Sequence, residues 1–150
     1  MSSAPRRPVH VPLIALAYRA YRAMAADMVN AAHRAGHLSI KQTHNAIFAT
    51  LGYEGMRAVD MAARMGITRQ SMGEIIREMV DLGILEMRPD PTDRRAKLVV
   101  YSEEGRRIAA EGFAHIQELD RRFTEEFGEE EYQTARRVLR RVAQRLNDDA

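Results

Sequence analysis

The chain has no cysteine among its 150 residues. It can therefore form no disulfide, thiolate metal site, catalytic thiol or thiol-based redox sensor. It also lacks a Gly-rich phosphate loop, a nucleophile elbow and a zinc-hydrolase motif, so we expect neither an enzyme nor a resident cofactor. The lack of cysteine fits a cytoplasmic location.

Long apolar runs are missing too, and none approaches the roughly 18 to 20 residues that cross a bilayer. Arg19 and Arg22 interrupt the apolar stretch near the start, and no clear cleavage site follows, so we expect neither a membrane span nor a signal peptide. A content of 45% hydrophobic and 29% charged residues indicates one folded domain with helical extensions. The net charge of +2 is too small to indicate nucleic acid by itself, so that inference rests on local placement.

Most of the chain has the apolar spacing of helices. Pro5, Pro8 and Pro12 keep the first dozen residues from being helical. Apolar residues three and four apart predict helices over 13–35, 41–51, 103–127 and 129–148, the second capped by Ser39. Gly36 and Gly128 are the expected stops of the first and third.

Residues 57–83 have the pattern of a helix-turn-helix. A short helix ends at Gly66, and Thr68 is the N-cap candidate of the next helix, which ends at Gly83. The short connection containing glycine is typical of this motif. The apolar stripe predicted for the second helix is Met72, Ile75, Ile76, Met79 and Leu82.

A charged β-hairpin is predicted directly after this unit. Its strands are 84–88 and 96–102, joined by a loop over 89–95 that contains two prolines. A helix-turn-helix with such a hairpin is a winged helix, whose second helix fits the major groove of DNA while the hairpin reaches the minor groove. The predicted fold class is mainly α with a small β-hairpin.

Residues 59–109, VDMAARMGITRQSMGEIIREMVDLGILEMRPDPTDRRAKLVVYSEEGRRIA, resemble the MarR family of transcriptional regulators. The family's wing signature, Asp-x-Arg before a strand and a helix start, is met by Asp93, Arg94 and Arg95. The resemblance implies a homodimeric repressor on double-stranded DNA, with Arg95 entering the minor groove and Asp93 orienting it. Arg94, nearer the tip, is the alternative, and a surface ion pair between Asp93 and Arg95 is the plainer interpretation.

The resemblance and the helix pattern together divide the chain into three parts. These are an N-terminal arm and dimerisation helix (1–37), a winged helix-turn-helix (38–101) and C-terminal dimerisation helices (102–150). Apolar residues on both terminal helices are more numerous than one chain can cover, so a second copy is expected. Two-fold symmetry would match a palindromic operator with half-sites one helical turn apart.

The expected DNA contacts lie on the second helix and on the wing. Gly73 is unusual inside a helix, and either close approach to DNA or tight packing against another helix explains it. Glu74 pairs with Arg77 or accepts from cytosine, and Arg57 is a further phosphate candidate. The candidates are Thr68, Arg69, Gln70, Ser71, Gly73, Glu74 and Arg77 on the helix, and Arg88, Asp93, Arg94, Arg95 and Lys97 on the wing.

A small aromatic ligand is a further expectation, because members of this family often bind one where the dimerisation helices meet the winged helix. The candidate residues, for which a plain core role is the alternative, are Tyr18, Tyr21, Arg22, His44, Phe48, Phe113 and His115. A metal-responsive regulator is a second alternative, because His33 and His37 share a helix face. No cysteine or inward carboxylate completes a ligand set, so we expect no metal. A nucleoid-type protein that binds DNA without sequence preference is the third alternative.

Overall fold

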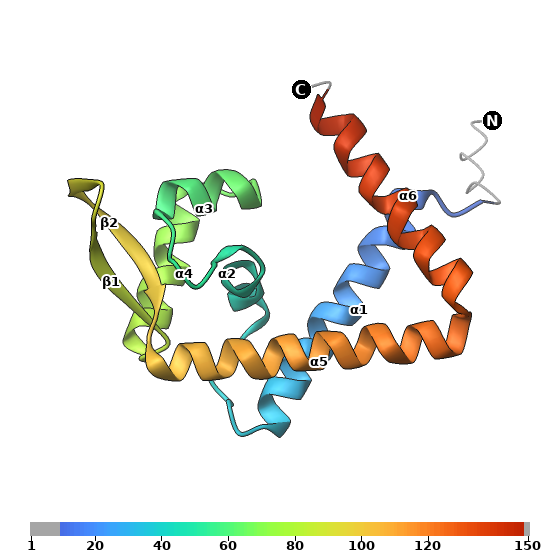
Figure 1. Cartoon of the computed structure of the whole chain (residues 1–150), viewed down its shortest axis with the longest axis horizontal. Coiled ribbons are helices and arrows are strands. Elements are labelled where there is room, and N and C mark those ends of the chain that lie inside the picture. Colours follow the sequence, from blue (N-terminus) through green and yellow to red (C-terminus); the bar gives the residue numbers. More distant parts are fainter. Residues whose placement is uncertain (1–9, 149–150) are drawn as a thin grey trace, which may run out of the picture. The chain divides into compact units, whose positions relative to one another are not determined.

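The computed structural model describes residues 10–148 (Figure 1). The expectation that the first dozen residues are not helical falls largely outside this range, although Pro12 does precede the first helix. The described chain forms two compact units, up to Ala110 and from Glu111 onward. Each is described by itself below.

The fold class is the predicted one, mainly helical with one two-stranded antiparallel hairpin. None of the helices within 10–148 is long and apolar enough to cross a membrane. The elements are α1 (Leu13–Arg34), η1 (Gln42–His44), α2 (Asn45–Thr50), α3 (Ala58–Met65), α4 (Arg69–Asp81), β1 (Leu85–Asp90), β2 (Asp93–Tyr101), α5 (Glu103–Phe127) and α6 (Glu129–Asp148).

The start of the second helix differs from the prediction. A 3₁₀ turn, η1, begins at Gln42, with Lys41 rather than Ser39 in the N-cap position. The backbone N–H of Ile40 donates to the carbonyl of His37, so Ser39 lies within a preceding turn. The side chain of Ile40 is buried just before η1 begins.

The helix-turn-helix forms as predicted, with α3 and α4 as its two helices. Gly66 ends α3 with φ 64°, a left-handed conformation that glycine adopts without strain. The hydroxyl of Thr68 accepts the backbone N–H of Ser71 at 3.0 Å, which confirms the predicted N-cap of α4. Leu82 was wrongly placed on the apolar stripe: α4 ends at Asp81, and Leu82 is 40% exposed.

The hairpin is longer than predicted, and its loop is shorter. Leu85 pairs with Tyr101 and the register runs regularly to Pro89 opposite Lys97, where it shifts so that Asp90 faces Asp93. Residues 94–96 are therefore a bulge in β2 with no partner on β1, and only Pro91 and Thr92 lie between the strands. Proline usually indicates a loop, but both strands of this hairpin are edge strands, where a missing N–H is tolerated.

One hydrophobic core holds the first unit together. Ile47 of α2, Met61 of α3, Met72 and Met79 of α4 and Val99 of β2 are completely buried in it. The backbone of Met56, just before α3, also pairs with Val99 of β2 in both directions. The wing is thereby joined to the helix-turn-helix by packing and by backbone hydrogen bonds.

The beginning of α5 is fixed against the end of α4. Ser102 donates its hydroxyl to the carbonyls of Gly83 and Ile84, at 2.6 and 3.1 Å, and accepts the N–H of Gly105 at 2.9 Å. The sequence had indicated a helix start at this serine, and the serine is the cap. Gly105 is buried because the helix crosses the Ile84 carbonyl at very short range.

The second unit comprises the rest of α5 and the whole of α6. Gly128, with φ 91°, separates the two helices as predicted. Phe123 packs against Phe127 and Tyr132, and the Tyr132 hydroxyl donates to Asp120. Several apolar side chains of α6 are exposed in the single chain: Val138, Leu139, Val142 and Leu146.

Candidate nucleic-acid interface

The recognition helix α4 has two distinct faces. Met72, Ile76 and Met79 are buried in the core, in agreement with the predicted apolar stripe. The residues expected to face DNA lie outward near the N-terminus of the helix. Arg69, Gln70, Ser71, Glu74 and Arg77 are exposed, as is the cap residue Thr68.

Two polar contacts on this face differ from those expected. The Gln70 amide donates to the Glu74 carboxylate at 3.2 Å, so Glu74 pairs with Gln70 and not with Arg77. The Thr68 hydroxyl also donates to the Ser71 hydroxyl at 2.8 Å, in addition to its capping role. Both hydroxyls are therefore held by the first turn, while the Arg69 side chain extends from an exposed position.

The packing around Gly73 distinguishes between its two explanations. A Cβ built at Gly73 would lie 3.2 Å from Nη1 of Arg77, and no other described atom comes within 4 Å beyond the helix's own backbone and chain neighbours. Tight packing against another helix is therefore the wrong explanation. Close approach to an external group stays a prediction.

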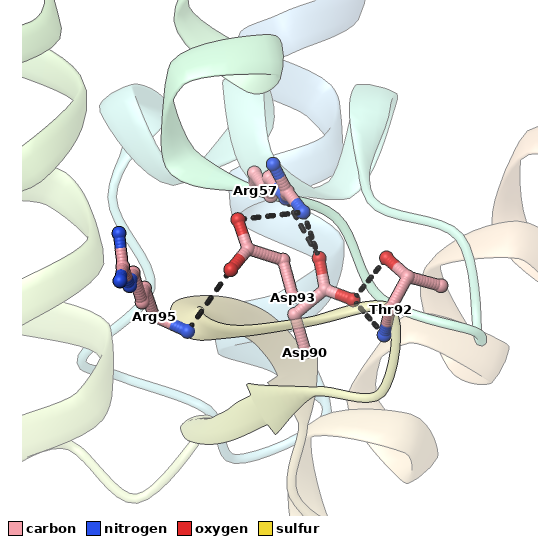
Figure 2. Close-up of polar contacts among 5 residues, drawn as sticks. All are labelled: Arg57, Asp90, Thr92, Asp93 and Arg95. Atoms are coloured by element: carbon pink, nitrogen blue, oxygen red, sulfur yellow. Dashed lines mark hydrogen bonds and ion pairs between the residues drawn. The ribbon is translucent and has the colours of Figure 1, made fainter.

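On the wing, the carboxylate of Asp93 contacts the backbone of Arg95. The Arg95 N–H donates to Asp93 Oδ1 at 3.0 Å, so the contact runs from a side chain to the backbone and not between the two side chains (Figure 2). The guanidinium of Arg95 extends away from the two aspartates and remains exposed. Arg94 and Lys97 are also exposed. Arg88 donates to Glu86 at 3.0 Å, which is a surface ion pair of little energetic value.

A buried carboxylate at the end of β1, beside the turn of the wing, is not among the predicted site residues. Asp90 is 5% exposed, and its Oδ2 accepts a hydrogen bond from Arg57 Nε at 2.7 Å and forms an ion pair with Arg57 Nη2 at 2.6 Å. Its Oδ1 accepts the N–H and the hydroxyl of Thr92 at 2.8 and 2.7 Å. Hydrogen bonds from Thr92, then the one from Arg57, lower the pKa of Asp90 to about 2.

Arg57, a further candidate for phosphate contact, is engaged by two carboxylates in the free protein. Its guanidinium lies between Asp90 and Asp93, with Nη2 also 3.7 Å from Asp93 Oδ2 (Figure 2). Hydrogen bonding to Asp90 raises the pKa of Arg57 further above its ordinary value. No local pattern links residues 33 positions apart, so the sequence offered no signal for this contact.

The expected ligand-binding residues do not form one group within either unit. Tyr18, Tyr21 and Arg22 are exposed on α1, with the Arg22 guanidinium 5.9 Å from the Tyr18 ring centroid. Phe48 is half-buried and stacks on Tyr101, with the ring centroids 6.0 Å apart. Phe113 and His115 belong to the second unit, the first exposed and the second half-buried.

His44 is completely buried beside the recognition helix. Its Nδ1 accepts the backbone N–H of Lys41 at 3.2 Å, so that nitrogen carries no proton. Its Nε2 is 3.4 Å from a Glu78 oxygen, close enough for an ion pair, but it is not directed for a hydrogen bond and has no such partner among the described residues. The hydrogen bond from Lys41 first, and then the closeness of His44 Nε2, lowers the pKa of Glu78.

One histidine of the pair in the metal alternative makes a structural contact. His33 Nε2 is 2.8 Å from the carbonyl oxygen of Ile40, a contact that ties α1 to the start of η1. No group of three potential ligands from His, Cys, Asp and Glu occurs among residues 10–148. No observation therefore favours the metal-responsive alternative.

These contacts define the class of protein. A helix-turn-helix with an outward polar face on its second helix, followed by a hairpin with an arginine-containing bulge, is a winged helix. In a comparison with known proteins, residues 38–96 match the model of the MarR family, the family that the sequence resembles.

Sequence relatives cover only part of the chain. Uncharacterised proteins of Mycobacterium tuberculosis and Mycobacterium bovis are 30% identical over 77 residues, which is 51% of this chain and 52% of each relative. The match thus spans about half the length of the curated relatives.

Solved structures extend the similarity in fold to most of the chain. A MarR family transcription regulator aligns with TM-score 0.73 and 21% identity over 87% of this chain and 85% of that chain. The repressor CouR bound to a 23-mer DNA duplex aligns with TM-score 0.71 and 18% identity over 95% and 99%. NadR in complex with 4-hydroxyphenylacetate aligns with TM-score 0.71 and 18% identity over 93% and 98%. At these identities, the similarity establishes the fold alone.

Proposed function

We propose that this protein is a DNA-binding transcriptional regulator, and not an enzyme. The observation that carries the proposal is the outward face of the winged helix. The N-terminal half of α4 presents Arg69 and Gln70, and the wing bulge presents Arg94 and Arg95, all on exposed positions of a well-packed unit. Guanidinium and amide groups of this kind read base edges in the major groove and enter the minor groove.

The proposed assembly is a homodimer that binds a palindromic operator as a repressor. The exposed apolar residues at both ends of the chain support it. Leu13, Ile14 and Leu16 of α1 are 50%, 80% and 48% exposed, and Leu146 of α6 is 67% exposed. A second copy of the chain would cover these side chains. Analytical ultracentrifugation at low micromolar concentration should show twice the chain mass, and a clean monomer would contradict the assembly.

Selection from a pool of random-sequence duplexes tests the proposed function. The protein should enrich an inverted repeat, and binding of that duplex should weaken steeply with salt because phosphate contacts release counterions. Enrichment of DNA without any shared sequence would favour the nucleoid-type alternative, and no binding at low salt would refute the proposal. A regulator of chromosomal DNA works where that DNA lies, so the proposed location is the cytoplasm.

Variants of the wing test how the DNA is contacted. Arg95→Ala should weaken binding of the selected duplex by about 1 to 3 kcal/mol and leave the fold intact. Arg94→Ala is the matched control, since it removes the same group one residue nearer the tip. A larger loss for Arg94→Ala would exchange the two roles, and no loss in either variant would remove the wing from the interface.

A small aromatic acid is the proposed effector. Two observations support it: the Arg22 guanidinium lies over the Tyr18 ring, and a protein of the same fold, NadR, is in complex with 4-hydroxyphenylacetate. A ligand shifts DNA affinity only if it binds the DNA-competent and the released forms with different affinity. A salicylate-like compound should therefore weaken binding of the selected duplex at high micromolar to millimolar concentration (roughly 4 to 6 kcal/mol of binding energy).

The effector proposal has its own variants. Arg22→Ala and Phe48→Ala should each reduce the response to a panel of aromatic acids, while DNA binding without ligand stays unchanged. Phe48→Ala also disturbs a half-buried ring, so its thermal unfolding is measured alongside. A panel without any response, or responses that both variants leave unchanged, would leave these residues as packing residues only.

A further inference from the structure

We propose that Arg57 is a positioning residue for the wing: by holding Asp90 and Asp93, it fixes the bulge that carries Arg94 and Arg95 (Figure 2). The inference rests on the proposed function, because the bulge matters for DNA only if the wing binds it. Arg57 itself contacts no DNA in this proposal. It acts through the two aspartates.

The contacts of the Asp90 carboxylate hold it in one position. Both oxygens of the Asp90 carboxylate are held: Oδ2 by the guanidinium of Arg57, and Oδ1 by the N–H and the hydroxyl of Thr92. The contact with Arg57 is charge-assisted, and the carboxylate is 5% exposed, so solvent competes little for it. Asp90 is also the residue at which the hairpin register shifts. Arg57 and Asp90, called the clamp below, therefore hold the wing at the position where the regular pairing of the strands ends.

The second contact of Arg57 reaches the bulge directly. Its Nη2 is 3.7 Å from Oδ2 of Asp93, while Oδ1 of Asp93 accepts the N–H of Arg95 at 3.0 Å. Residues 94–96 have no ladder partner on β1, so this hydrogen bond is a local restraint on the backbone that carries the arginines. Bulges direct side chains away from the regular alternation of a strand, and a bulge that reads DNA needs one fixed direction.

The place of Arg57 in the fold supports this role. It occupies the N-cap position of α3, where serine, threonine, aspartate or asparagine usually caps a helix, and its side chain makes no capping hydrogen bond. The position is adjacent to Met56, whose backbone pairs with Val99 of β2. The guanidinium thus joins the first helix of the helix-turn-helix to the wing, at the point where their backbones already meet.

Arg57→Gln tests the clamp, and Arg64→Gln is its matched control. Arg64 lies on the exposed side of the same helix, and the same change there leaves the wing contacts intact. In the free protein, the backbone ¹⁵N heteronuclear NOE of Arg94 and Arg95 should fall in Arg57→Gln and stay unchanged in Arg64→Gln. An unchanged NOE in Arg57→Gln would overturn the proposal, whatever the DNA measurements show.

DNA binding provides the second measurement. Affinity for the duplex that the wild type selects should fall by about tenfold in Arg57→Gln, within the range of coupled residues in one network. In an Arg95→Ala background, Arg57→Gln should have almost no further effect. If Arg57→Gln instead lowers the affinity equally in the wild type and in the Arg95→Ala background, Arg57 contacts DNA itself. That result would overturn the positioning role.

A third test exchanges the charged residues at positions 57 and 90. The double variant Arg57→Asp with Asp90→Arg should regain part of the wing order and affinity that each single variant loses. If the wild type selects no duplex but Arg57→Gln still loosens the bulge, the proposed function fails and the clamp stands. If the exchange variant folds and regains neither property, the pairing of these two side chains is not what orders the wing.

Discussion

Replacing Gly73 by alanine should raise the stability of the free protein and lower its affinity for DNA. Gly73 lies in the first half of α4, among the residues proposed to face the major groove. Glycine inside a helix costs about 1 kcal/mol relative to alanine, mainly because its backbone loses more conformational freedom on folding. In the free chain, the fold does not require glycine at this position, because a Cβ there would meet only the end of the Arg77 side chain.

The size of the stability gain follows from what the new methyl group would meet. The nearest atom is Nη1 of Arg77 at 3.2 Å, the far end of an exposed side chain that can move by a few tenths of an ångström. We therefore expect the free energy of unfolding to rise by about 0.5 to 1 kcal/mol. On DNA, a methyl group forced against a closely packed surface should cost about 1 to 3 kcal/mol, a loss of roughly 5- to 160-fold in affinity.

Urea unfolding and fluorescence anisotropy measure the two effects. Unfolding is followed at one fixed protein concentration, because the stability of a dimer depends on it. Anisotropy uses the duplex that the wild type selects and a random duplex, and only the specific complex should weaken. Unchanged specific affinity together with higher stability would refute close approach of DNA to Gly73. Lower stability would mean that Arg77 cannot move aside.

Three further outcomes are expected. Gly105→Ala should destabilise the protein by about 2 to 4 kcal/mol in urea unfolding, because overpacking and loss of buried hydrogen bonds exceed the gain in helix propensity: its Cβ would lie 1.9 Å from the backbone oxygen of Ile84. Asp90→Asn should be less stable than the wild type at neutral pH. Since folding lowers the pKa of Asp90 to about 2, this difference is present above about pH 4 and should disappear as the pH falls toward 2. Diamide should not release DNA through disulfide formation, because the chain has no cysteine, and release would point to another oxidised group.

The helix-turn-helix could be predicted because short-range rules decide it. Gly66 adopts the left-handed conformation that ends α3, and Thr68 caps α4 through a residue three positions on. The apolar spacing then gives the buried face of α4. Each of these features depends on neighbours within one or two helical turns, so the sequence alone contains the information.

The hairpin was predicted to exist, but its boundaries were not. Two prolines and several charges between 89 and 95 indicated a loop. In the structure, Pro89 pairs opposite Lys97, and only the next residue, Asp90, shifts the register. The ends of a two-stranded sheet depend on contacts with the rest of the fold, here with Arg57, and such contacts leave no periodic signal in the sequence.

The sequence could not distinguish the expected ligand-binding residues from core residues. Aromatic side chains at helical spacing are compatible with a pocket and with a core, and burial separates the two only residue by residue. His44 is completely buried, and its Nδ1 accepts the backbone N–H of Lys41. It is therefore a packing residue of the winged helix in the free protein. Tyr18 and Arg22 are exposed, so the effector proposal depends more on them than on His44.

Three residues of the first unit depart from the usual residue preferences of helices. Arg57 occupies an N-cap without capping it and instead binds Asp90. Gly105 lies inside a helix because the Ile84 carbonyl leaves no room for a Cβ. Gly73 also lies inside a helix, but nothing in the chain requires it there beyond a movable arginine. Local inconsistencies in natural sequences concentrate at functional or strained sites. Because the fold accounts for the first two and not for the third, the requirement at Gly73 is best sought outside the chain, at the DNA.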